Sequence, residues 1–451
     1  MPSALLLTCE PIPLVRIALI GLGDRGMKTL RRYAFIPHAE IRYVVDLDSE
    51  KTETANAALT QSGRPAAVAF CGAEAWKTVC EKEDVDLVYV CTEWNTHTPM
   101  AVYAMEHGKH VAVEVPAATT VEECFRLVRT AEATQRHCFM TENCCYDFFA
   151  LQTLEMFQKG KLGTITHCEG AYIHRIAEVE QEVKRGESEM FRRHWMAQSY
   201  STHGGNPYPT HGIGPIAQLL GIHRKDRFKT ITSVTARGVR RGEEWIGKVN
   251  SSLLTTEGGV TILLQLDVTT PRPYSRLQTV CGTKGFVQKY PLPVVEWMEE
   301  GGDETCGEVK PFSFSGEEAL KVMEEQFSES AASQLWAEGH KKGVPNEMNY
   351  VMDRRLIHCL HHGLPLDLDV YDAAEWSCLC ELSQISAARG GVPVEIPDFL
   401  GEGWRETILI PSLSLSLFFF FFLSFPFSFS FYLLLSSKIL RFRLSVFYDS
   451  D

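Results

Sequence analysis

The sequence predicts an α/β protein with two domains. The N-terminal domain is doubly wound around a parallel sheet, and the C-terminal α+β domain has an open, mainly antiparallel sheet. Three observations lead to this prediction. Strand-like apolar runs alternate with helical patterns up to about residue 145. Beyond that point several strand-like runs follow one another without helices between them, and a glycine-rich turn comes directly after the first apolar run.

The first domain is expected at residues 14–145, after an N-terminal extension of residues 1–13. The run at residues 15–20 (VRIALI) is apolar and β-branched and ends at Gly21, which is typical of a strand buried on both faces. Because strands and helices alternate from here on, the sheet should be parallel. Strands are predicted at residues 15–20, 41–45, 85–90, 110–113 and 138–142, and helices at residues 25–36, 52–59, 99–108 and 121–134.

The second domain is expected at residues 146–407. It begins with a helix at residues 149–159 and an alternating strand at residues 163–173, and then residues 174–215 read as an irregular segment rich in His, Arg, Gly and Pro. Successive strands without intervening helices favour antiparallel pairing. The other predicted strands cover residues 230–237, 251–256, 260–268 and 277–288, and the other predicted helices cover residues 346–362 and 371–389.

Composition and charge narrow the classes of function. The chain has 451 residues and a formal net charge of −13, which argues against nucleic acid as a partner because phosphate binding needs clustered Lys and Arg. Its 14 cysteines show neither the spacing of a disulfide scaffold nor paired CxxC motifs, so we expect free thiols and no metal site. No basic segment precedes the short apolar run at the N-terminus. We therefore expect a cytoplasmic protein.

Residues 408–451 form a separate, low-complexity tail of Ser, Leu, Phe and Pro. We expect the tail to be an artefact, because pyrimidine-rich DNA translated by read-through would encode the same residue types. The alternative is a membrane anchor, since residues 417–435 are long and apolar enough to cross a bilayer and basic residues follow them. A membrane is a partner only if the tail is real.

A glycine motif indicates a nucleotide site. Gly21, Gly23 and Gly26 form the pattern G-x-G-x-x-G directly after a strand and at the start of a helix, and Asp46 ends the next strand 20 residues after the last glycine. In this context the pattern predicts a Rossmann dinucleotide-binding domain with the pyrophosphate at the helix N-terminus. The Asp46 carboxylate can bond both ribose hydroxyls and would repel a 2′-phosphate. NAD is therefore the expected cofactor.

Loops at the carboxyl ends of the other parallel strands should line the same crevice. They are residues 91–97 (CTEWNTH), the pair Glu114 and Val115, and the pair Glu142 and Asn143. Trp94 and His97 can contact the cofactor, but core packing and helix capping remain open alternatives for both.

Several motifs in order resemble known families. GLGDRG, VVDLD and CTEWNTHTPMAVYAMEHGKHVAVEVP resemble the Gfo/Idh/MocA family of NAD-dependent sugar oxidoreductases. TENCCYDFF, GAYIH, GNPYPTHGIGP and VTTPRPYSR together resemble glycoside hydrolase family 109, whose named activity is α-N-acetylgalactosaminidase. The resemblance implies hydrolysis of a small glycoside by transient oxidation at C3, deprotonation at C2, elimination of the aglycone, addition of water and re-reduction. Such a reaction needs NAD without consuming it.

The resemblance also implies roles for individual residues. Tyr172 and His211 are the acid–base candidates: a phenol beside a nicotinamide cation can serve as base at C2, and an imidazole can handle the C3 hydroxyl proton. Glu142 completes the catalytic set as a group that orients or polarises its neighbours. The other cofactor positions are Asp24, Arg25, Asp46, Trp94, Asn95, Thr96, His97, Glu114, Val115 and Asn143, and the sugar positions are Tyr172, Tyr208, Pro209, Thr210, His211 and Tyr274.

Three features keep other readings open. Tyr172 at the end of a strand and His211 in a Pro/Gly-rich loop are also compatible with packing roles. The family typically has an Arg directly after Trp195, where this chain has Met196, and residues 175–194 look shortened, so a non-catalytic NAD-binding relative is one alternative.

The other alternative is a sugar or polyol dehydrogenase. Such enzymes carry Glu-Lys-Pro where this chain has Glu114, Val115 and Pro116, and Val115 cannot move a proton, which favours the hydrolase. We also expect a homo-oligomer, since an open sheet face favours self-association.

Overall fold

A computed structural model describes residues 3–174, 195–236, 239–241, 244–247, 249–298 and 312–401, and these residues belong to one compact unit. The tail at residues 408–451, with its predicted span at 417–435, lies outside the described residues, as do residues 175–194. Among the helices that are described, none combines the length and the apolar character needed to cross a membrane.

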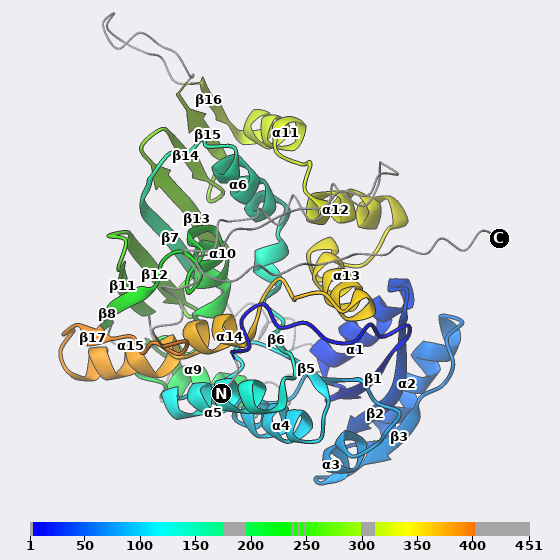
Figure 1. Ribbon diagram of the computed structural model, residues 1–451. Helices are drawn as coiled ribbons and strands as arrows, with labels where there is room; N and C mark the ends of the chain where they lie inside the picture. The colour runs from blue at the N-terminus through cyan, green and yellow to red at the C-terminus, as the bar shows by residue number, and fades with distance from the viewer. Residues whose placement is uncertain are drawn as a thin grey trace, which may run out of the picture. The chain divides into compact units, whose positions relative to one another are not determined.

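The N-terminal domain is built on a six-stranded sheet in the order β3-β2-β1-β4-β5-β6, in which every neighbouring pair is parallel (Figure 1). This order reverses between β1 and β4, which is where doubly wound folds bind nucleotides. The strands are β1 (Val15–Ile20), β2 (Ala39–Asp46), β3 (Val68–Cys71), β4 (Leu87–Val90), β5 (His110–Val113) and β6 (Cys138–Met140).

Helices cover this sheet because its central strands are apolar on both faces. All four residues of β4 and all four of β5 are buried, so neither face can meet water. The longest of the covering helices, α5 (Val121–Thr134), begins with a capping box in which Thr120 and Glu123 satisfy each other's backbone amides. The other helical segments are α1 (Asp24–Arg32), η1 (Tyr33–Phe35), α2 (Ser49–Gln61), α3 (Ala75–Cys80), α4 (Trp94–Glu106) and η2 (Asn143–Tyr146).

The second domain contains a nine-stranded sheet in the order β16-β15-β14-β13-β7-β12-β11-β8-β17. Only the pair β7 and β12 is parallel among these described strands, so the predicted open, mainly antiparallel sheet is confirmed. Its strands are β7 (Ile165–Ile173), β8 (Phe228–Thr235), β11 (Val249–Thr256), β12 (Thr261–Asp267), β13 (Ser275–Gly282), β14 (Gly285–Gln288), β15 (Val294–Trp297), β16 (Phe312–Ser315) and β17 (Val394–Glu395), and β9 (Val239–Arg241) and β10 (Glu244–Gly247) form a separate pair.

One helix lies unusually close to this sheet. A Cβ added to Gly170 of β7 would stand 2.2 Å from the carbonyl oxygen of Gly212, and one added to Gly212 would stand 2.7 Å from the amide nitrogen of Ala171. Glycine at both positions therefore lets α10 (Thr210–Leu220) rest backbone to backbone on β7. The domain's other helices are α6 (Phe148–Gln158), α9 (Trp195–Thr202), α11 (Gly316–Gln326), α12 (Ala331–Lys342), α13 (Glu347–His362), α14 (Val370–Ser377) and α15 (Leu379–Ala388).

The structure corrects several sequence-based expectations. Residues 94–97 form the first turn of α4 rather than a loop, because Pro99 lies inside that helix and not at its start. Residues 195–202 and 210–220 are helical within the segment predicted to be irregular, so His211 lies on α10 and not in a loop. The predicted strand at residues 277–288 is the hairpin β13–β14. β3, α3, α11, α12, β15, β16 and β17 were not predicted.

Candidate active site

The glycine loop leaves room for a phosphate group. Gly21 has a φ of +90°, and a Cβ at Gly26 would stand 1.9 Å from the carbonyl oxygen of Gly21, so both positions require glycine. A Cβ at Gly23, in contrast, would meet nothing within 4 Å. Gly23 is also the N-cap of α1 and supplies no capping side chain, so the first amides of the helix have no side-chain acceptor. This open, positively polarised helix end fits a pyrophosphate.

Asp46 lies against the same loop. Its Oδ2 accepts a hydrogen bond from the amide of Leu22 (2.6 Å), and Lys51 lies 3.5 Å from its Oδ1. The carboxylate is thus fixed at the end of β2, beside the turn between Gly21 and Gly23. This is the position from which an acidic side chain reaches the ribose of NAD in a Rossmann domain.

The remaining predicted cofactor residues surround the ends of β4 and β5. Arg25 donates from Nε to Oε1 of Glu114 (2.6 Å), which joins the start of α1 to the end of β5. Val115 is buried in the main core, Asp24 pairs with Lys28 on the exposed side of α1, and Asn95 is exposed on α4.

Thr96 and His97 are engaged with nearby protein groups. Thr96 donates from its hydroxyl to the carbonyl of Glu93 (2.7 Å). His97 is 1% exposed and lies within hydrogen-bond distance of two carbonyl oxygens, Nδ1 to Pro116 (2.8 Å) and Nε2 to Thr92 (3.1 Å). Both contacts are those expected if His97 packs in the core and does not contact the cofactor.

Five aromatic side chains from both domains meet beside the nucleotide crevice. Trp94, at the start of α4, stacks on Tyr208 with ring centroids 5.4 Å apart and planes at 19°. Trp195 and Tyr200 of α9 contact the edge of Trp94 at 5.0 and 5.7 Å. Tyr172 contacts Tyr208 at 4.9 Å. We call this set (Trp94, Tyr172, Trp195, Tyr200 and Tyr208) the aromatic cluster, and it joins the Rossmann domain to the second domain.

A chain of polar contacts runs from the Rossmann domain into the aromatic cluster. Glu142, which follows β6 and is fully buried, lies with Oε1 2.6 Å from Nδ1 of His211. Nε2 of His211 lies 3.1 Å from the hydroxyl of Tyr208. Glu142 Oε1 also accepts the amide of Cys144 (3.0 Å), which fixes the carboxylate. The structure therefore brings Glu142 to Tyr208 and His211, which lie more than 60 residues further along the chain.

These contacts set the charge of the buried pair. Burial lowers the pKa of His211, but Cys144 and the Glu142 carboxylate outweigh it and raise that pKa to about 10. Burial raises the pKa of Glu142, but His211 outweighs it and the net shift is downward. At neutral pH the pair is therefore an imidazolium beside a carboxylate.

Tyr172 has its own partner. Its hydroxyl lies 2.9 Å from Nδ1 of His174, two residues further along the chain, and its ring lies 5.5 Å from that of His211. Tyr274 contacts the ring of His174 at 5.3 Å and is 46% exposed, so it lies at the rim of the group. Burial raises the pKa of Tyr172 well above its ordinary value, so the phenol is neutral at pH 7.

Sequence reasoning missed two contributors to this group. His174 is the last residue of the GAYIH motif and follows directly after β7. Only its contact with Tyr172 shows that it belongs to the site. Asp147, the N-cap of α6, binds Arg276 (2.8 Å) and Lys289 (2.6 Å) and so anchors the segment that carries Tyr274.

The remaining predicted site residues are placed as follows. Asn143 binds Asn349 of α13 (3.0 Å). Pro209 and Thr210 start α10 and place His211 in its first turn. The side chain of Met196 lies outside the described residues.

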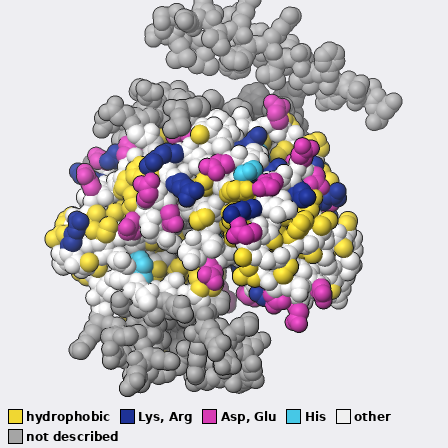
Figure 2. Space-filling view, turned by 90° about the horizontal axis from the view of Figure 1, so that it is seen from below, with side chains coloured by type: hydrophobic (Ala, Val, Ile, Leu, Met, Phe, Trp, Pro, Cys, Tyr) yellow, Lys and Arg dark blue, Asp and Glu magenta, His cyan; other side chains and the backbone are white. Residues whose placement is uncertain are grey.

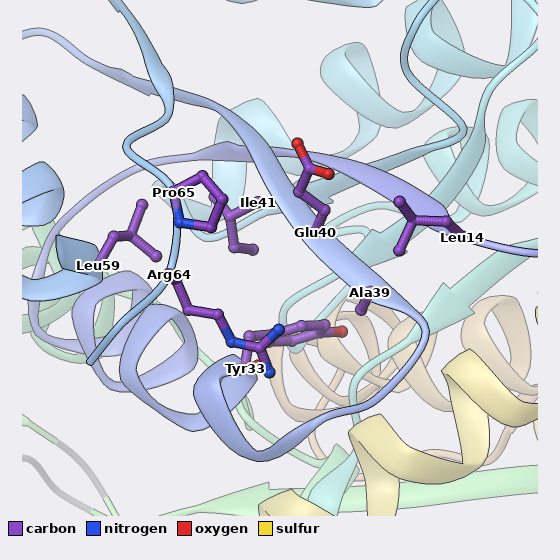
Figure 3. Close-up of a pocket in the computed structure, with 8 residues that line it drawn as sticks. All are labelled: Leu14, Tyr33, Ala39, Glu40, Ile41, Leu59, Arg64 and Pro65. Carbon is purple, nitrogen blue, oxygen red and sulfur yellow. Dashed lines mark hydrogen bonds between the residues drawn. The ribbon is translucent and has the colours of Figure 1, made fainter.

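A cavity elsewhere in the Rossmann domain contains none of the predicted site residues. Figure 3 shows this space of about 180 Å³ near η1 and β2, where the Arg64 guanidinium bonds the carbonyl of Ala34 (2.7 Å). It is lined by Leu14, Tyr33, Ala39, Glu40, Ile41, Leu59, Arg64 and Pro65.

On the face seen in Figure 2, Lys and Arg side chains are interspersed with Asp and Glu side chains over the part of the chain that is described.

The fold and the site define a two-domain protein of the Gfo/Idh/MocA class, with a Rossmann domain for NAD. Residues 15–142 match the NAD-binding Rossmann fold of that oxidoreductase family, and residues 146–406 match the glycosyl hydrolase 109 C-terminal domain. A solved levoglucosan dehydrogenase in complex with NADH has the same fold, with a TM-score of 0.64 and 14% identity over 85% of this chain and 99% of that one.

Curated relatives are much closer in sequence. An α-N-acetylgalactosaminidase of Bacteroides fragilis is 48% identical over 414 residues, which cover 88% of this chain and 94% of the relative. A glycosyl hydrolase family 109 protein of Phocaeicola vulgatus is 49% identical over 422 residues, 90% of this chain and 99% of the relative. The chain belongs to glycosyl hydrolase family 109 and is a glycosidase with an NAD-binding Rossmann domain.

Proposed function

We propose that the protein hydrolyses small α-N-acetylgalactosaminides with a bound NAD that is regenerated in every turnover. The observation that carries the proposal is the arrangement of Glu142, His211 and Tyr172 beside the end of β6, next to the nucleotide crevice. The similarity to the Bacteroides fragilis α-N-acetylgalactosaminidase supports the choice of sugar. No pair of opposed carboxylates is needed, because the reaction passes through oxidation of the sugar.

The residues that would hold the cofactor are those of the glycine loop and its surroundings. The open space at Gly23 and the free helix end would take the pyrophosphate, and Asp46 would take the ribose hydroxyls. When bound, NAD supplies reversible hydride transfer at C3 of the sugar. The presence of a carboxylate at Asp46 favours NAD over NADP.

Tyr172 would take the C2 proton of the oxidised sugar. A hydrogen beside a ketone is far more acidic than one beside an alcohol, so a phenolate suffices as base. Burial alone keeps the phenol neutral, but a positive charge nearby lowers the pKa of a phenol. The Nδ1 atom of His174, 2.9 Å from the hydroxyl, gives the phenol proton an acceptor. We assign His174 to positioning Tyr172 and relaying its proton.

The pair of Glu142 and His211 would handle the proton of the C3 hydroxyl. The imidazolium can donate this proton when the sugar is reduced again. To accept the proton during oxidation it must first lose its own Nε2 proton to solvent, which becomes easier once a bound cation lowers its raised pKa toward neutrality. Glu142 holds Nδ1, so that Nε2 is the atom left to face the substrate, in the place where it now contacts Tyr208. Glu142 is thus a positioning residue for His211.

The test is a hydrolysis assay with no added NAD. We expect a nitrophenyl α-N-acetylgalactosaminide to be cleaved, and deuterium at C2 to be replaced by hydrogen from water. Steady accumulation of NADH that matches substrate turnover, with no release of aglycone, would instead identify a sugar dehydrogenase. The alternative is disfavoured by Val115, which stands where those dehydrogenases carry a lysine.

Two variants test the assigned residues. Tyr172→Phe and His211→Ala should each lower kcat by about 10²- to 10⁴-fold, the range of general acid–base catalysis, while the NAD content of the purified protein stays constant. Tyr200→Phe is the matched control, since it removes a hydroxyl from the same aromatic cluster. Wild-type protein that holds NAD yet turns over no glycoside or polyol in a broad panel would make the chain a non-catalytic relative.

A further inference from the structure

Three different kinds of metal ligand meet at the inner end of the active site. One carboxylate oxygen of Glu142, the Sγ atom of Cys144 and a ring nitrogen of His211 all lie within 4.8 Å of one another. They come from two elements, the segment after β6 and the first turn of α10. The mechanism above uses Glu142 and His211 and leaves Cys144 without a role.

A second, independent feature marks the same place. The Oε2 atom of Glu142 is buried and makes no hydrogen bond of good geometry among the described residues, whereas Oε1 has two partners. The Thr210 hydroxyl lies near enough to help lower the pKa of the carboxylate. A buried carboxylate is unfavourable unless something positive compensates it, and the His211 imidazolium is the positive group that a metal ion would replace. Cys144 is 2% exposed, whereas the His211 side chain keeps 13% exposure and gives the group a side open to solvent.

The separations suit a tetrahedral site after small rotations. A zinc ion with its usual bond lengths to nitrogen, oxygen and sulfur keeps these atoms about 3.4–3.6 Å apart. The Nδ1 atom of His211 and Oε1 of Glu142 are now 2.6 Å apart and would have to separate, and the Cys144 sulfur lies within 4.8 Å of the ligand atoms of both residues. Three protein ligands would leave the fourth position to water or a sugar hydroxyl.

A second cluster of possible metal ligands, which contains no cysteine, already holds a positive group of the protein. His223, Asp369 and Asp372 also bring ligand atoms within 4.8 Å of one another. There, however, Arg224 bonds Asp369 (3.0 Å) and Asp372 (2.8 Å), so a guanidinium already occupies the place of a cation. No Arg or Lys is bonded to Glu142 among the described contacts.

We propose that Glu142, Cys144 and His211 form an inhibitory binding site for a thiophilic divalent cation such as Zn²⁺ or Cd²⁺. The thiolate selects these ions over Mg²⁺ and Ca²⁺, which prefer oxygen ligands. On binding, the protons on Nδ1 of His211 and Sγ of Cys144 pass to solvent, and the cation takes their places. The rotation that makes room for the cation between Nδ1 and Glu142 also moves Nε2 of His211 away from the C3 hydroxyl. The inhibitory part of the proposal rests on the proposed function, whereas the binding part does not.

Cobalt tests the binding without any substrate. The full-length protein, with its NAD as purified, is titrated with Co²⁺, and a thiolate-to-cobalt charge-transfer band of one sulfur is expected in the near ultraviolet. Cys144→Ser should lose the band, because a serine hydroxyl is a poor ligand for this ion. Cys145→Ser is the matched control and should keep it, since the Cys145 sulfur faces Gly214 instead. Cys144→Ala, checked by circular dichroism, replaces the serine variant if that one misfolds.

Zinc then tests the inhibition. In wild-type protein Zn²⁺ should suppress hydrolysis and EDTA should restore it, whereas Mg²⁺ at the same concentration should have no effect. The half-inhibitory Zn²⁺ concentration should rise at least tenfold in Cys144→Ser and stay constant in Cys145→Ser.

Two results would overturn the site. One is the absence of a thiolate band in wild-type protein. The other is a thiolate band that Cys144→Ser leaves unchanged, which would put the metal at another of the free cysteines. A normal band in a protein that hydrolyses no glycoside would leave the metal site standing and refute the proposed function instead.

Discussion

In the glycine loop, one glycine serves folding and another serves cofactor binding. Gly26 meets the protein's own backbone, while Gly23 faces open space. The two glycines look alike in the motif, yet they serve different purposes, one for packing the helix start and one for admitting a ligand.

We expect Gly23→Ala and Gly26→Ala to behave differently. Gly23→Ala should leave the unfolding free energy of the NAD-free protein within about 0.5 kcal/mol of wild type, since its φ of −69° suits alanine and its Cβ meets nothing. Its affinity for NAD should fall at least tenfold. Gly26→Ala should destabilise the protein by roughly 1–3 kcal/mol or more, because the new methyl overlaps the Gly21 carbonyl. Denaturant unfolding and NAD titration measure both, and equal loss of stability in the two variants would contradict this assignment.

The sequence could predict some site residues and not others. Asp46 and the glycines were predictable because a strand, a turn and a helix that follow one another fix their geometry locally. The contact between Glu142 and His211 spans 69 positions, and only the packing of α10 on β7 creates it. Cys144 carried no signal, since its neighbours in space are remote in the chain.

At the scale of elements, α10 shows why the helical prediction failed there. Its sequence, THGIGPIAQLL, contains two glycines and a proline and reads as a turn. Gly212 allows the close approach to β7, as its contact with Gly170 shows, and Gly214 packs against the side chains of Glu142, Cys145 and Trp376, so both glycines serve packing and not flexibility. A strand such as β3 was missed for another reason, because Val68–Cys71 is short and largely exposed and lacks a buried face.

The helix α13 is fastened to α1 by a buried ion pair. Asp353, which is fully buried, accepts from Nε of Arg32 (2.7 Å) and from the hydroxyl of Tyr89 (3.3 Å). Asp353→Asn would leave the buried guanidinium uncompensated and should destabilise the protein by about 3–5 kcal/mol in urea unfolding.

The control for this prediction is an exposed pair. Glu325→Gln breaks the contact between Lys321 and Glu325 (3.8 Å) on the surface of α11 and should change the unfolding free energy by no more than about 0.5 kcal/mol. A loss below about 1 kcal/mol in Asp353→Asn would show that this ion pair does not hold α13 in place.

At the scale of the whole molecule, the unfolding free energy should fall at alkaline pH because a buried histidine loses its proton. Burial and Arg224 lower the pKa of His223, but the surrounding carboxylates outweigh them and raise it to about 10. The groups that face His223 are Arg224, Asp369, Tyr371, Asp372 and Glu375. Since the folded-state pKa exceeds the unfolded value of about 6.5, the protonated group stabilises the fold fully below that pH.

This contribution is lost as the pH rises from about 6.5 to about 10. The unfolding free energy should fall over this window by up to about 1.4 kcal/mol per pH unit for one proton. His211 titrates in the same window, so the comparison is with His223→Gln, whose stability should fall less steeply. Parallel curves for wild type and variant, measured by urea unfolding at each pH, would exclude His223 as the source.

The boundary between the two matched domains has a consequence for how such proteins can be recombined. The Rossmann match ends at residue 142 and the next match begins at residue 146, so the seam runs between the Glu142 carboxylate and its partner His211. If the nucleotide domain were exchanged alone, the buried carboxylate of Glu142 would be separated from the imidazolium of His211. Trp94 would likewise be separated from Tyr208. A working chimera would have to carry both partners from the same parent, which makes the pair of domains, and not either one alone, the unit that evolution can shuffle.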